Sequence, residues 1–505
     1  MLLSCCSVGC STKIKISSQG NTVIAKPVNL TAAAAGYSKI KAGKADPSTI
    51  EAYNRQTRIA VDQLTSPFVS KSFRTTLRTE SGNLPVTVDP SGIKNYDRVD
   101  RIEIADTVII RDGIDRAYES PGAGIPLAAR IVRTEDDPLI PEAGTWIPLT
   151  ALLESRDGNP TIKLIDTADP HSSSPFPVAA NFSAPIARDL NSRQREFQKV
   201  EALLNFDKFE PYMGIKRIFD FHPDKIPVVL VHGMLSECTT WANALNEMMR
   251  DPVIRDRYEF WIYGFPTGAP IPYLSQKLRE DVETMYRYRR DHGSTTTDVT
   301  VIGHSMGGLM AKTLTQTSGD SQWQRFFEVS PEQLDVSTED KAALREMFYF
   351  KPLPYVNRVI FVATPHLGAE AADRSYANFA AQLIRSPKTL VMATQNVLHQ
   401  GFHALTPLGV DIHHDFPNSI EQMKFGSELG AIFSDIPLNP SVRYHSIIGS
   451  QNGLDIPKEE MTDGVLTYTS AHLDGIPETI VESSHGVIRN PDGMAEIIRL
   501  LKSSR

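Results

Sequence analysis

Short apolar runs recur through the C-terminal three-fifths of the chain. The run at residues 226–231 reads I-P-V-V-L-V and is apolar at every position. Such runs are typical of strands that are buried on both faces, as in parallel sheets. The predicted strands are residues 226–231, 259–263, 299–302, 358–363, 444–448 and 478–481.

Helical patterns separate these runs. Residues 273–290 place Leu274, Leu278, Val282 and Met285 on one face of a helix. A last helix begins after Asn490, a capping residue followed by Pro491 at the first helical position. Its predicted buried face is Met494, Ile497, Ile498 and Leu501. Alternating strands and helices predict an α/β fold, with a mostly parallel sheet and helices on both faces.

Residues 21–210 show a different pattern of apolar and polar positions. Residues 47–64 predict a helix, and residues 31–43, rich in Ala and Lys with two glycines, predict a mobile linker ahead of it. Short alternating runs divided by Gly, Pro and Asp then follow, at residues 99–110, 125–132 and 161–165. This pattern predicts a β-rich, sandwich-like accessory domain with an N-terminal helix. We expect it to act as a scaffold or to present substrate.

The most informative motif follows the run at residues 299–302. Gly303-His304-Ser305-Met306-Gly307 fits G-x-S-x-G, with a strand pattern before it and a helical pattern after it. A serine on such a strand-to-helix turn exposes its hydroxyl, and the tight turn requires glycine on both sides. Ser305 is therefore the predicted nucleophile.

The partners of Ser305 should follow it in the chain as Asp or Glu and then His, the order of the α/β-hydrolases. Asp463 lies in T-D-G-V-L, after the strand at 444–448, and His485 lies in S-S-H-G-V, after the strand at 478–481. Asp455 and Asp474 compete for the acidic position, but the separation from His485 favours Asp463 because it allows one connection and one strand. Catalytic residues are thus predicted at Ser305, Asp463 and His485.

An oxyanion hole is expected at the end of an earlier strand. The run at 226–231 is followed by His232-Gly233-Met234. The predicted donors are the backbone N–H groups of Met234 and of Met306, the residue after the serine. His232 is an alternative catalytic base, disfavoured because it precedes Ser305 in the chain.

Taken together, these motifs resemble the lipase-like α/β-hydrolases, and within them the bacterial triacylglycerol lipases and lecithin–cholesterol-acyltransferase-like hydrolases. The resemblance covers residues 211–505 through I-P-V-V-L-V-H-G, G-H-S-M-G-G, F-V-A-T-P-H-L-G, T-D-G-V-L and S-S-H-G. It implies a Ser305–Asp463–His485 triad and acyl-ester or lipid substrates. It also implies a cap inserted at about residues 369–440, which holds apolar helical segments.

The predicted activity is that of a carboxylic ester hydrolase, a lipase or esterase that works through an acyl-serine. An acyltransferase or thioesterase would use the same triad, and a binding protein could keep the fold without activity. The chemistry requires no cofactor, and no zinc-ligand spacing occurs in the sequence. A structural Ca²⁺, the natural ester and the oligomeric state are left open.

Composition and charge limit the number of domains and the classes of binding partner. The 505 residues suggest two or three domains, and the net charge of −8 gives no basic patch for nucleic acid. No apolar run approaches the length of a membrane span. Cys238 alone lies outside the first ten residues, so no internal disulfide framework is predicted.

The first 20 residues predict a signal-like tip. Val8-Gly9-Cys10-Ser11 resembles the end of a bacterial lipoprotein signal, in which Cys10 would carry lipid. This predicts an extracytoplasmic protein anchored to a membrane by lipid without spanning it. The alternative is a cysteine-rich tip on a cytoplasmic protein.

Overall fold

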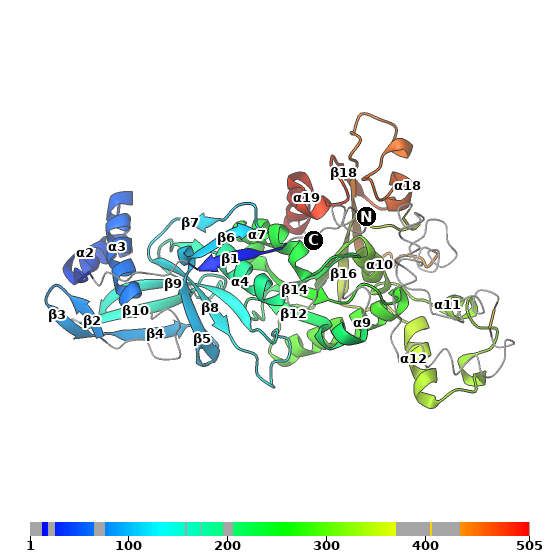
Figure 1. Cartoon of the computed structure of the whole chain (residues 1–505), viewed down its shortest axis with the longest axis horizontal. Coiled ribbons are helices and arrows are strands. Elements are labelled where there is room, and N and C mark those ends of the chain that lie inside the picture. The colour runs from blue at the N-terminus through cyan, green and yellow to red at the C-terminus, as the bar shows by residue number, and fades with distance from the viewer. Residues whose placement is uncertain are drawn as a thin grey trace.

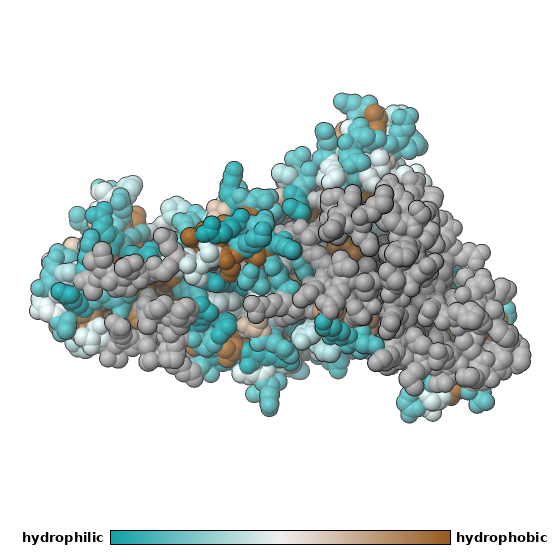
Figure 2. Space-filling view, in the orientation of Figure 1, coloured by the Kyte–Doolittle hydropathy of each residue, from teal (hydrophilic) through white to brown (hydrophobic). Residues whose placement is uncertain are grey.

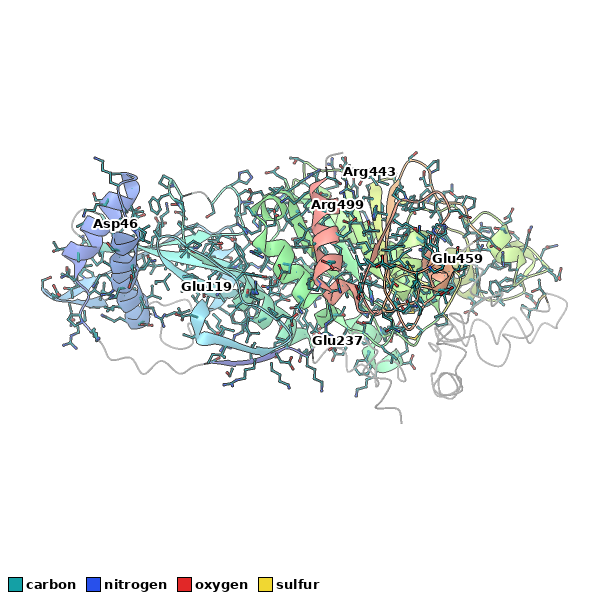
Figure 3. All side chains as sticks on the ribbon, turned by 90° about the horizontal axis from the view of Figure 1, so that it is seen from above. Asp46, Glu119, Glu237, Arg443, Glu459 and Arg499 are labelled. Carbon is teal, nitrogen blue, oxygen red and sulfur yellow. The ribbon has the colours of Figure 1, made fainter. Side chains whose placement is uncertain are left out.

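The computed structural model describes residues 13–18, 26–64, 76–156, 159–172, 174–194, 206–369, 405–406 and 435–503. Along the longest axis, helices α2 and α3 lie at one end of the molecule and α12 at the other (Figure 1). Seen from above, Asp46 lies near the first end and Glu459 toward the second (Figure 3).

A seven-stranded sheet forms the centre of the C-terminal part, in the order β12-β14-β13-β15-β16-β17-β18. The edge strand β12 is antiparallel to β14, and the other pairs are parallel. The strands are β12 (Gly214–Ile218), β13 (Ile226–Val231), β14 (Tyr258–Gly264), β15 (Val299–His304), β16 (Val356–Val362), β17 (Arg443–Gly449) and β18 (Glu478–Val481). All six strands expected from the apolar runs are present.

The central strands of this sheet are buried on both faces, to which their successive side chains point alternately. Val228 and Leu230 of β13 belong to a core shared with α7 and α19, whereas Val229 and Val231 pack with α9, α10 and α12. This explains why the strands are apolar at nearly every position. The longer helices are α7 (Ala242–Arg250), α9 (Ile271–Asp291), α10 (Met306–Thr313), α12 (Thr338–Phe348) and α19 (Pro491–Lys502).

Short helices complete the C-terminal part. They are α6 (Phe206–Phe209), α8 (Pro252–Arg257), α11 (Ser321–Gln324), α18 (Tyr468–Ala471), η3 (Glu210–Tyr212), η4 (Cys238–Trp241), η5 (Pro331–Gln333), η8 (Lys458–Glu460) and η9 (Val487–Arg489). Helix α19 begins as predicted, with the Asn490 side chain accepting hydrogen bonds from the backbone N–H groups of Asp492 and Gly493. The predicted cap falls almost entirely outside the described residues.

The N-terminal part is built on a five-stranded sheet of order β4-β10-β9-β8-β5. Its strands are β4 (Thr87–Gly92), β5 (Val99–Ile104), β8 (Ile125–Ile131), β9 (Thr145–Arg156) and β10 (Asn159–Asp166). Smaller two-stranded sheets pair β1 (Lys15–Ser18) with β6 (Val108–Asp112), β2 (Thr76–Thr79) with β3 (Gly82–Pro85), and β7 (Glu119–Ser120) with β11 (Ala180–Asn181). Residues 15–18, assigned to the tip from sequence, therefore pair with the N-terminal body.

Two expectations for this part are corrected. The described residues form one larger sheet with helices packed on its strand β9, not two facing sheets of a sandwich. Residues 31–43 are largely helical, and α2 (Leu30–Lys41) is capped by the Asn29 side chain. Alanine, the best helix former, outweighs the single glycine inside this helix, and Gly36 allows close packing because a Cβ there would lie 3.0 Å from Tyr53 Cβ.

Helix α3 (Pro47–Leu64) has the predicted bounds, and α4 (Ser183–Arg193) packs on β9 as well. Two short 3₁₀ helices, η1 (Tyr96–Arg98) and η2 (Ala105–Thr107), flank β5. Among the described residues, no helix is both long and apolar enough to cross a membrane. The described surface in Figure 2 is mainly hydrophilic.

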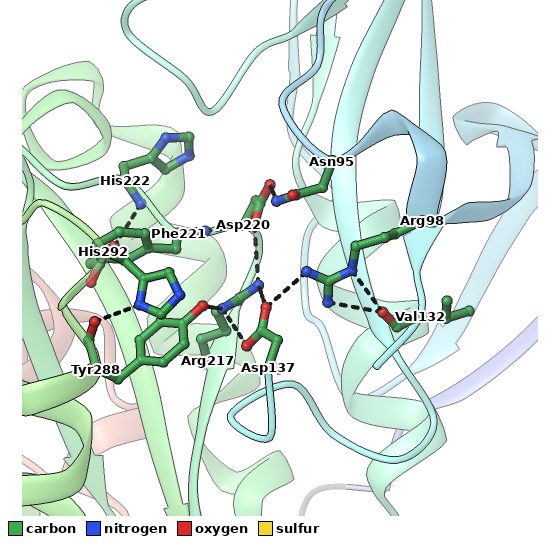
Figure 4. A network of polar contacts seen from close by, with 11 residues as sticks. Asn95, Arg98, Val132, Asp137, Arg217, Asp220, Phe221, His222, Tyr288 and His292 are labelled. Atoms are coloured by element: carbon green, nitrogen blue, oxygen red, sulfur yellow. Dashed lines mark hydrogen bonds and ion pairs between the residues drawn. The ribbon is translucent and has the colours of Figure 1, made fainter. Parts of the chain in front are cut away.

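The two parts are joined by a buried polar network at the edge of the seven-stranded sheet (Figure 4). Arg217 of β12 binds both carboxylate oxygens of Asp137, at 2.9 and 2.7 Å, and Arg98 binds Asp137 at 3.0 Å. The backbone N–H of Arg217 also donates to the carbonyl of Leu139. The loop that carries Asp137 thus covers the edge strand, where unpaired backbone groups would otherwise be exposed.

Helix α7 provides a second contact between the parts. The Asn243 side chain exchanges hydrogen bonds with the backbone N–H and the carboxylate of Asp115, at 2.9 and 2.8 Å. Asn246 accepts a hydrogen bond from Ser183 and donates one to the Arg116 carbonyl. The N-terminal part therefore contacts the seven-stranded part through side-chain hydrogen bonds as well as through the chain connection.

Candidate active site

Ser305 lies on the turn between β15 and α10. Its backbone has φ 53° and ψ −127°, a left-handed conformation that costs about 1–3 kcal/mol for a residue with a side chain. The turn is tight because a Cβ on Gly303 would lie 2.6 Å from the Gly307 carbonyl oxygen, and one on Gly307 would lie 2.4 Å from the Val231 carbonyl oxygen. Glycine at both motif positions is therefore a steric requirement.

Three side chains that are far apart in the sequence meet at this turn. His485 Nε2 lies 2.9 Å from Ser305 Oγ, and His485 Nδ1 lies 2.7 Å from Asp463 Oδ2. All three residues are buried, with 3 to 7% of their surface exposed. An ionised carboxylate can only accept, so Nδ1 carries the proton and Nε2 is left to accept the Ser305 hydroxyl proton. The structure thus brings the predicted residues into one hydrogen-bonded chain.

The acidic residue is held in place from its other side. Asp463 Oδ1 accepts the backbone N–H groups of Val465 and Leu466, at 2.9 and 2.7 Å. The competing carboxylates lie elsewhere. Asp455 is exposed, and Asp474 is exposed and bonded to His472. The contacts therefore select Asp463 from the three acidic residues that the sequence offered.

His232, the alternative base, is part of the core. Its ring stacks on Phe265 at 4.1 Å, Nδ1 lies 3.0 Å from the Gly233 carbonyl oxygen, and Nε2 accepts the Phe265 N–H at 3.4 Å. Burial lowers the pKa of His232 to about 4, despite the hydrogen bond to Gly233. A neutral ring with both nitrogens in use fixes the turn after β13 and does not take the proton of Ser305.

The turn after β13 lies directly against the serine. A Cβ on Gly233 would lie 2.8 Å from Ser305 Cβ, so the backbone can approach only as glycine. The next residue, Met234, is half-buried, and Met306 is the buried first residue of α10. The first N–H groups of a helix have no partner within it. Of the two predicted oxyanion donors, Met306 therefore follows Ser305 on its own turn, and Met234 lies on the turn that packs against Ser305.

Sequence reasoning missed His304. This buried residue precedes Ser305, and its Nε2 lies 3.0 Å from the backbone carbonyl oxygen of His485. The motif leaves the position open, and the contact joins segments separated by 181 positions. No pattern in the sequence could have revealed it.

No metal-binding group of three or more His, Cys, Asp or Glu side chains is formed within the described ranges. The predicted apolar cap segments at 377–384 and 390–398 lie outside these ranges.

The strand order, the antiparallel edge strand β12 and the serine on the turn after β15 define a lipase-like α/β-hydrolase. Residues 223–401 match the family described as "Putative serine esterase (DUF676)". That match contains Ser305 and ends before Asp463 and His485. Fold and family match together support ester hydrolysis.

The chain is also similar to solved structures of lipases and esterases. A lipase of Bacillus licheniformis in its mature form is 16% identical over 56% of this chain and 94% of that chain, with a TM-score of 0.34. EstA of Clostridium botulinum is 13% identical over 56% and 88%, with a TM-score of 0.32. A metagenomic carboxyl esterase is 15% identical over 53% and 66%, with a TM-score of 0.28. No curated protein sequence matches this chain.

Proposed function

We propose that the protein is a carboxylic ester hydrolase, a lipase or esterase, with Ser305 as its nucleophile. The observation that carries the proposal is the continuous chain of hydrogen bonds from Asp463 through His485 to Ser305. A serine is a weak nucleophile by itself and is activated by an adjacent base that a third group orients. Those three parts are present at hydrogen-bond distance.

In the first half of the reaction, Ser305 Oγ attacks the ester carbonyl carbon while its proton passes to His485 Nε2. The tetrahedral intermediate then breaks its bond to the alcohol oxygen, and His485 returns the proton to the departing alcohol. In the second half, water attacks the acyl-serine and gives its proton to His485. The carboxylic acid leaves, and the proton returns to Ser305 Oγ.

Asp463 and two backbone N–H groups stabilise charge during these steps. Asp463 stabilises the imidazolium that forms twice in each cycle. The backbone N–H groups of Met234 and Met306 bind the oxyanion, and the loss of one such donor typically costs about a hundred- to a thousand-fold in kcat. Acyl esters or lipids are the substrates that this site would serve.

A lipid anchor at Cys10 belongs to the same proposal and would keep the enzyme at a membrane, where lipid esters are found. Its test is incorporation of a labelled fatty acid into the full chain in a bacterial host. Wild type should be labelled and Cys10→Ser should not. Equal labelling of the two, or none of wild type, would refute the anchor.

The test of the activity is hydrolysis of a p-nitrophenyl ester series, from acetate to palmitate, by wild type and Ser305→Ala. Ser484→Ala is the matched control, since Ser484 is an exposed neighbour of His485. We expect activity in wild type and the control and none in Ser305→Ala. An inert wild type, or an equally active Ser305→Ala, would overturn the proposal.

The same preparations separate the related activities. A p-nitrophenyl ester assayed with added glycerol would yield glyceride instead of free acid if the enzyme were an acyltransferase. An acyl-thioester substrate turned over faster than the matching oxygen ester would indicate a thioesterase. Free acid as the main product from oxygen esters is the expected result.

A further inference from the structure

His304 connects the strand that carries the nucleophile to the loop that carries the base. It is the last residue of β15 and is 2% exposed. Its Nε2 lies 3.0 Å from the carbonyl oxygen of His485. A carbonyl oxygen only accepts, so the Nε2 of His304 must carry a proton and donate it.

The loop around His485 is positioned by main-chain hydrogen bonds, among them the bond from the Ser483 N–H to the Ser450 carbonyl oxygen at 3.1 Å. Residues 482–486 contain no helix or strand, and the residues immediately before them form the short strand β18. The backbone N–H of His485 donates to the Asp463 carbonyl at 3.0 Å. The His304 ring therefore supplies the second backbone anchor, so that both main-chain polar groups of His485 are held.

The two anchors come from Asp463 and from His304, the residue before Ser305. Asp463 holds the N–H of His485, whereas the carbonyl is held from β15, one residue before Ser305. The rings of His304 and His485 also pack at 5.2 Å between centroids, inclined by 48°. The strand that positions Ser305 Oγ therefore also positions His485 Nε2.

The site is built to accommodate this ring. A Cβ on Gly233 would lie 3.2 Å from His304 Nδ1 as well as 2.8 Å from Ser305 Cβ. The glycine after β13 thus makes room for both residues. If His304 only filled space in the core, its ring would not need a nitrogen directed at the backbone carbonyl of His485.

We propose that His304 is a positioning residue, which fixes His485 in register with Ser305 through its Nε2–H bond to the His485 carbonyl. The inference rests on the proposed ester hydrolysis. A misplacement of about 1 Å in such a site can cost on the order of a hundredfold in rate. Loss of the bond should therefore lower kcat and leave KM nearly unchanged, because His304 is buried and acts through His485.

The test compares His304→Gln with His304→Met. Both side chains are unbranched and of similar length, but only glutamine offers an N–H near the position of the histidine Nε2. His304→Phe is a further variant that keeps a ring without a donor. Each variant is assayed on the best p-nitrophenyl ester, and its Tm is measured so that kcat can be compared at a temperature where it is folded.

We expect His304→Met and His304→Phe to lose about 10- to 100-fold in kcat, with KM changed less than about threefold, and His304→Gln to recover most of the loss. Equal kcat in Gln and Met variants would overturn the inference, as would a wild-type kcat in His304→Met. If His304→Phe does not fold, the comparison of Gln and Met decides alone. An inert wild type would instead refute the hydrolase proposal.

Discussion

His485 and Asp463 are joined twice. The side chains meet at 2.7 Å between Nδ1 and Oδ2, and the backbone N–H of His485 donates to the carbonyl oxygen of Asp463 at 3.0 Å. The main-chain bond fixes where the loop of His485 lies, and the side-chain bond fixes the tautomer of the ring. A substitution can separate these two functions, because only the side-chain bond needs the carboxylate of Asp463.

Asp463→Asn should keep the backbone bond and the fold while presenting an amide to His485 Nδ1. The imidazolium then loses its counter-charge, and the ring can adopt the wrong tautomer. We expect kcat to fall by about 10⁴-fold with little change in Tm. Asp474→Asn is the control, since Asp474 is exposed and its side chain is bonded to His472 rather than to His485. An Asp463→Asn variant within about tenfold of wild type would remove Asp463 from the triad.

Gly233→Ala should disable the site through sterics alone. The new Cβ would lie 2.8 Å from Ser305 Cβ, a separation that real Cβ atoms do not tolerate, so the turn after β13 or the serine must move. We expect kcat to fall by at least about a hundredfold, because both the proposed nucleophile and the proposed oxyanion donors would be displaced.

The matched control for Gly233→Ala is Gly486→Ala, next to His485. A Cβ there would meet only Ser484 Oγ, at 3.9 Å, and the backbone φ of −77° suits alanine. This variant should keep its activity within about threefold. Equal losses in the two variants would show that any added methyl near the site is harmful and that contact with Ser305 is not the cause.

The sequence predicted what is encoded locally or by order along the chain. Ser305 is predicted because its turn needs glycines at fixed spacing, and six of the seven strands of the larger sheet are predicted because burial on both faces favours apolar runs. The choice of Asp463 followed from the order and spacing of α/β-hydrolase residues.

What the sequence did not reveal depends on contacts between distant segments. Helix α2 was taken for a linker because its glycine was given more weight than its alanines, and the packing of Gly36 on Tyr53 is invisible in a single sequence. Likewise, nothing in the sequence pairs Arg217 with Asp137, or His304 with the carbonyl of His485. Such pairs appear only once the segments that carry them are folded together.

Arg217→Ala should weaken the junction between the two parts. Arg217 is 2% exposed and binds Asp137 and Asp220, so its removal leaves buried carboxylates without their main partner. We expect the free energy of unfolding to fall by about 3–5 kcal/mol, measured by chemical denaturation. Arg287→Ala, at an exposed ion pair, should change it by less than about 0.5 kcal/mol. Ester hydrolysis by the folded fraction should be unaffected, since Arg217 lies outside the site.

The same junction should be sensitive to acid. Burial opposes ionisation of Asp137, but Arg217 and Arg98 outweigh it and hold the pKa of Asp137 below its ordinary value. The stability that Asp137 contributes is therefore present above that ordinary value and is lost as the pH falls through the folded-state pKa. In Arg217→Ala this acid-dependent loss should be smaller. An unchanged pH dependence of unfolding below pH about 4 would show that Asp137 is not responsible.

Asp166→Asn should stabilise the protein at alkaline pH. Burial raises the pKa of Asp166 to about 7 from the ordinary 3.8, and its Oδ1 accepts the Ala168 N–H at 2.8 Å, a bond that asparagine can keep. The folded protein therefore binds this proton more tightly than the unfolded chain. Stability is highest below the unfolded-state pKa and declines as the pH rises through about 7.

An asparagine cannot ionise and escapes that decline. The difference in Tm between Asp166→Asn and wild type should thus be larger and more positive at pH about 8 than at pH about 5. Asp89→Asn is the matched control, because Asp89 Oδ1 likewise accepts the backbone N–H two residues later, that of Ser91, and Asp89 is only partly buried. The Tm difference for Asp166→Asn could instead be the same at both pH values. The buried carboxyl would then be neutral throughout, or its ionisation would not destabilise the fold. In either case, Asp166 would not limit the stability of the protein at alkaline pH.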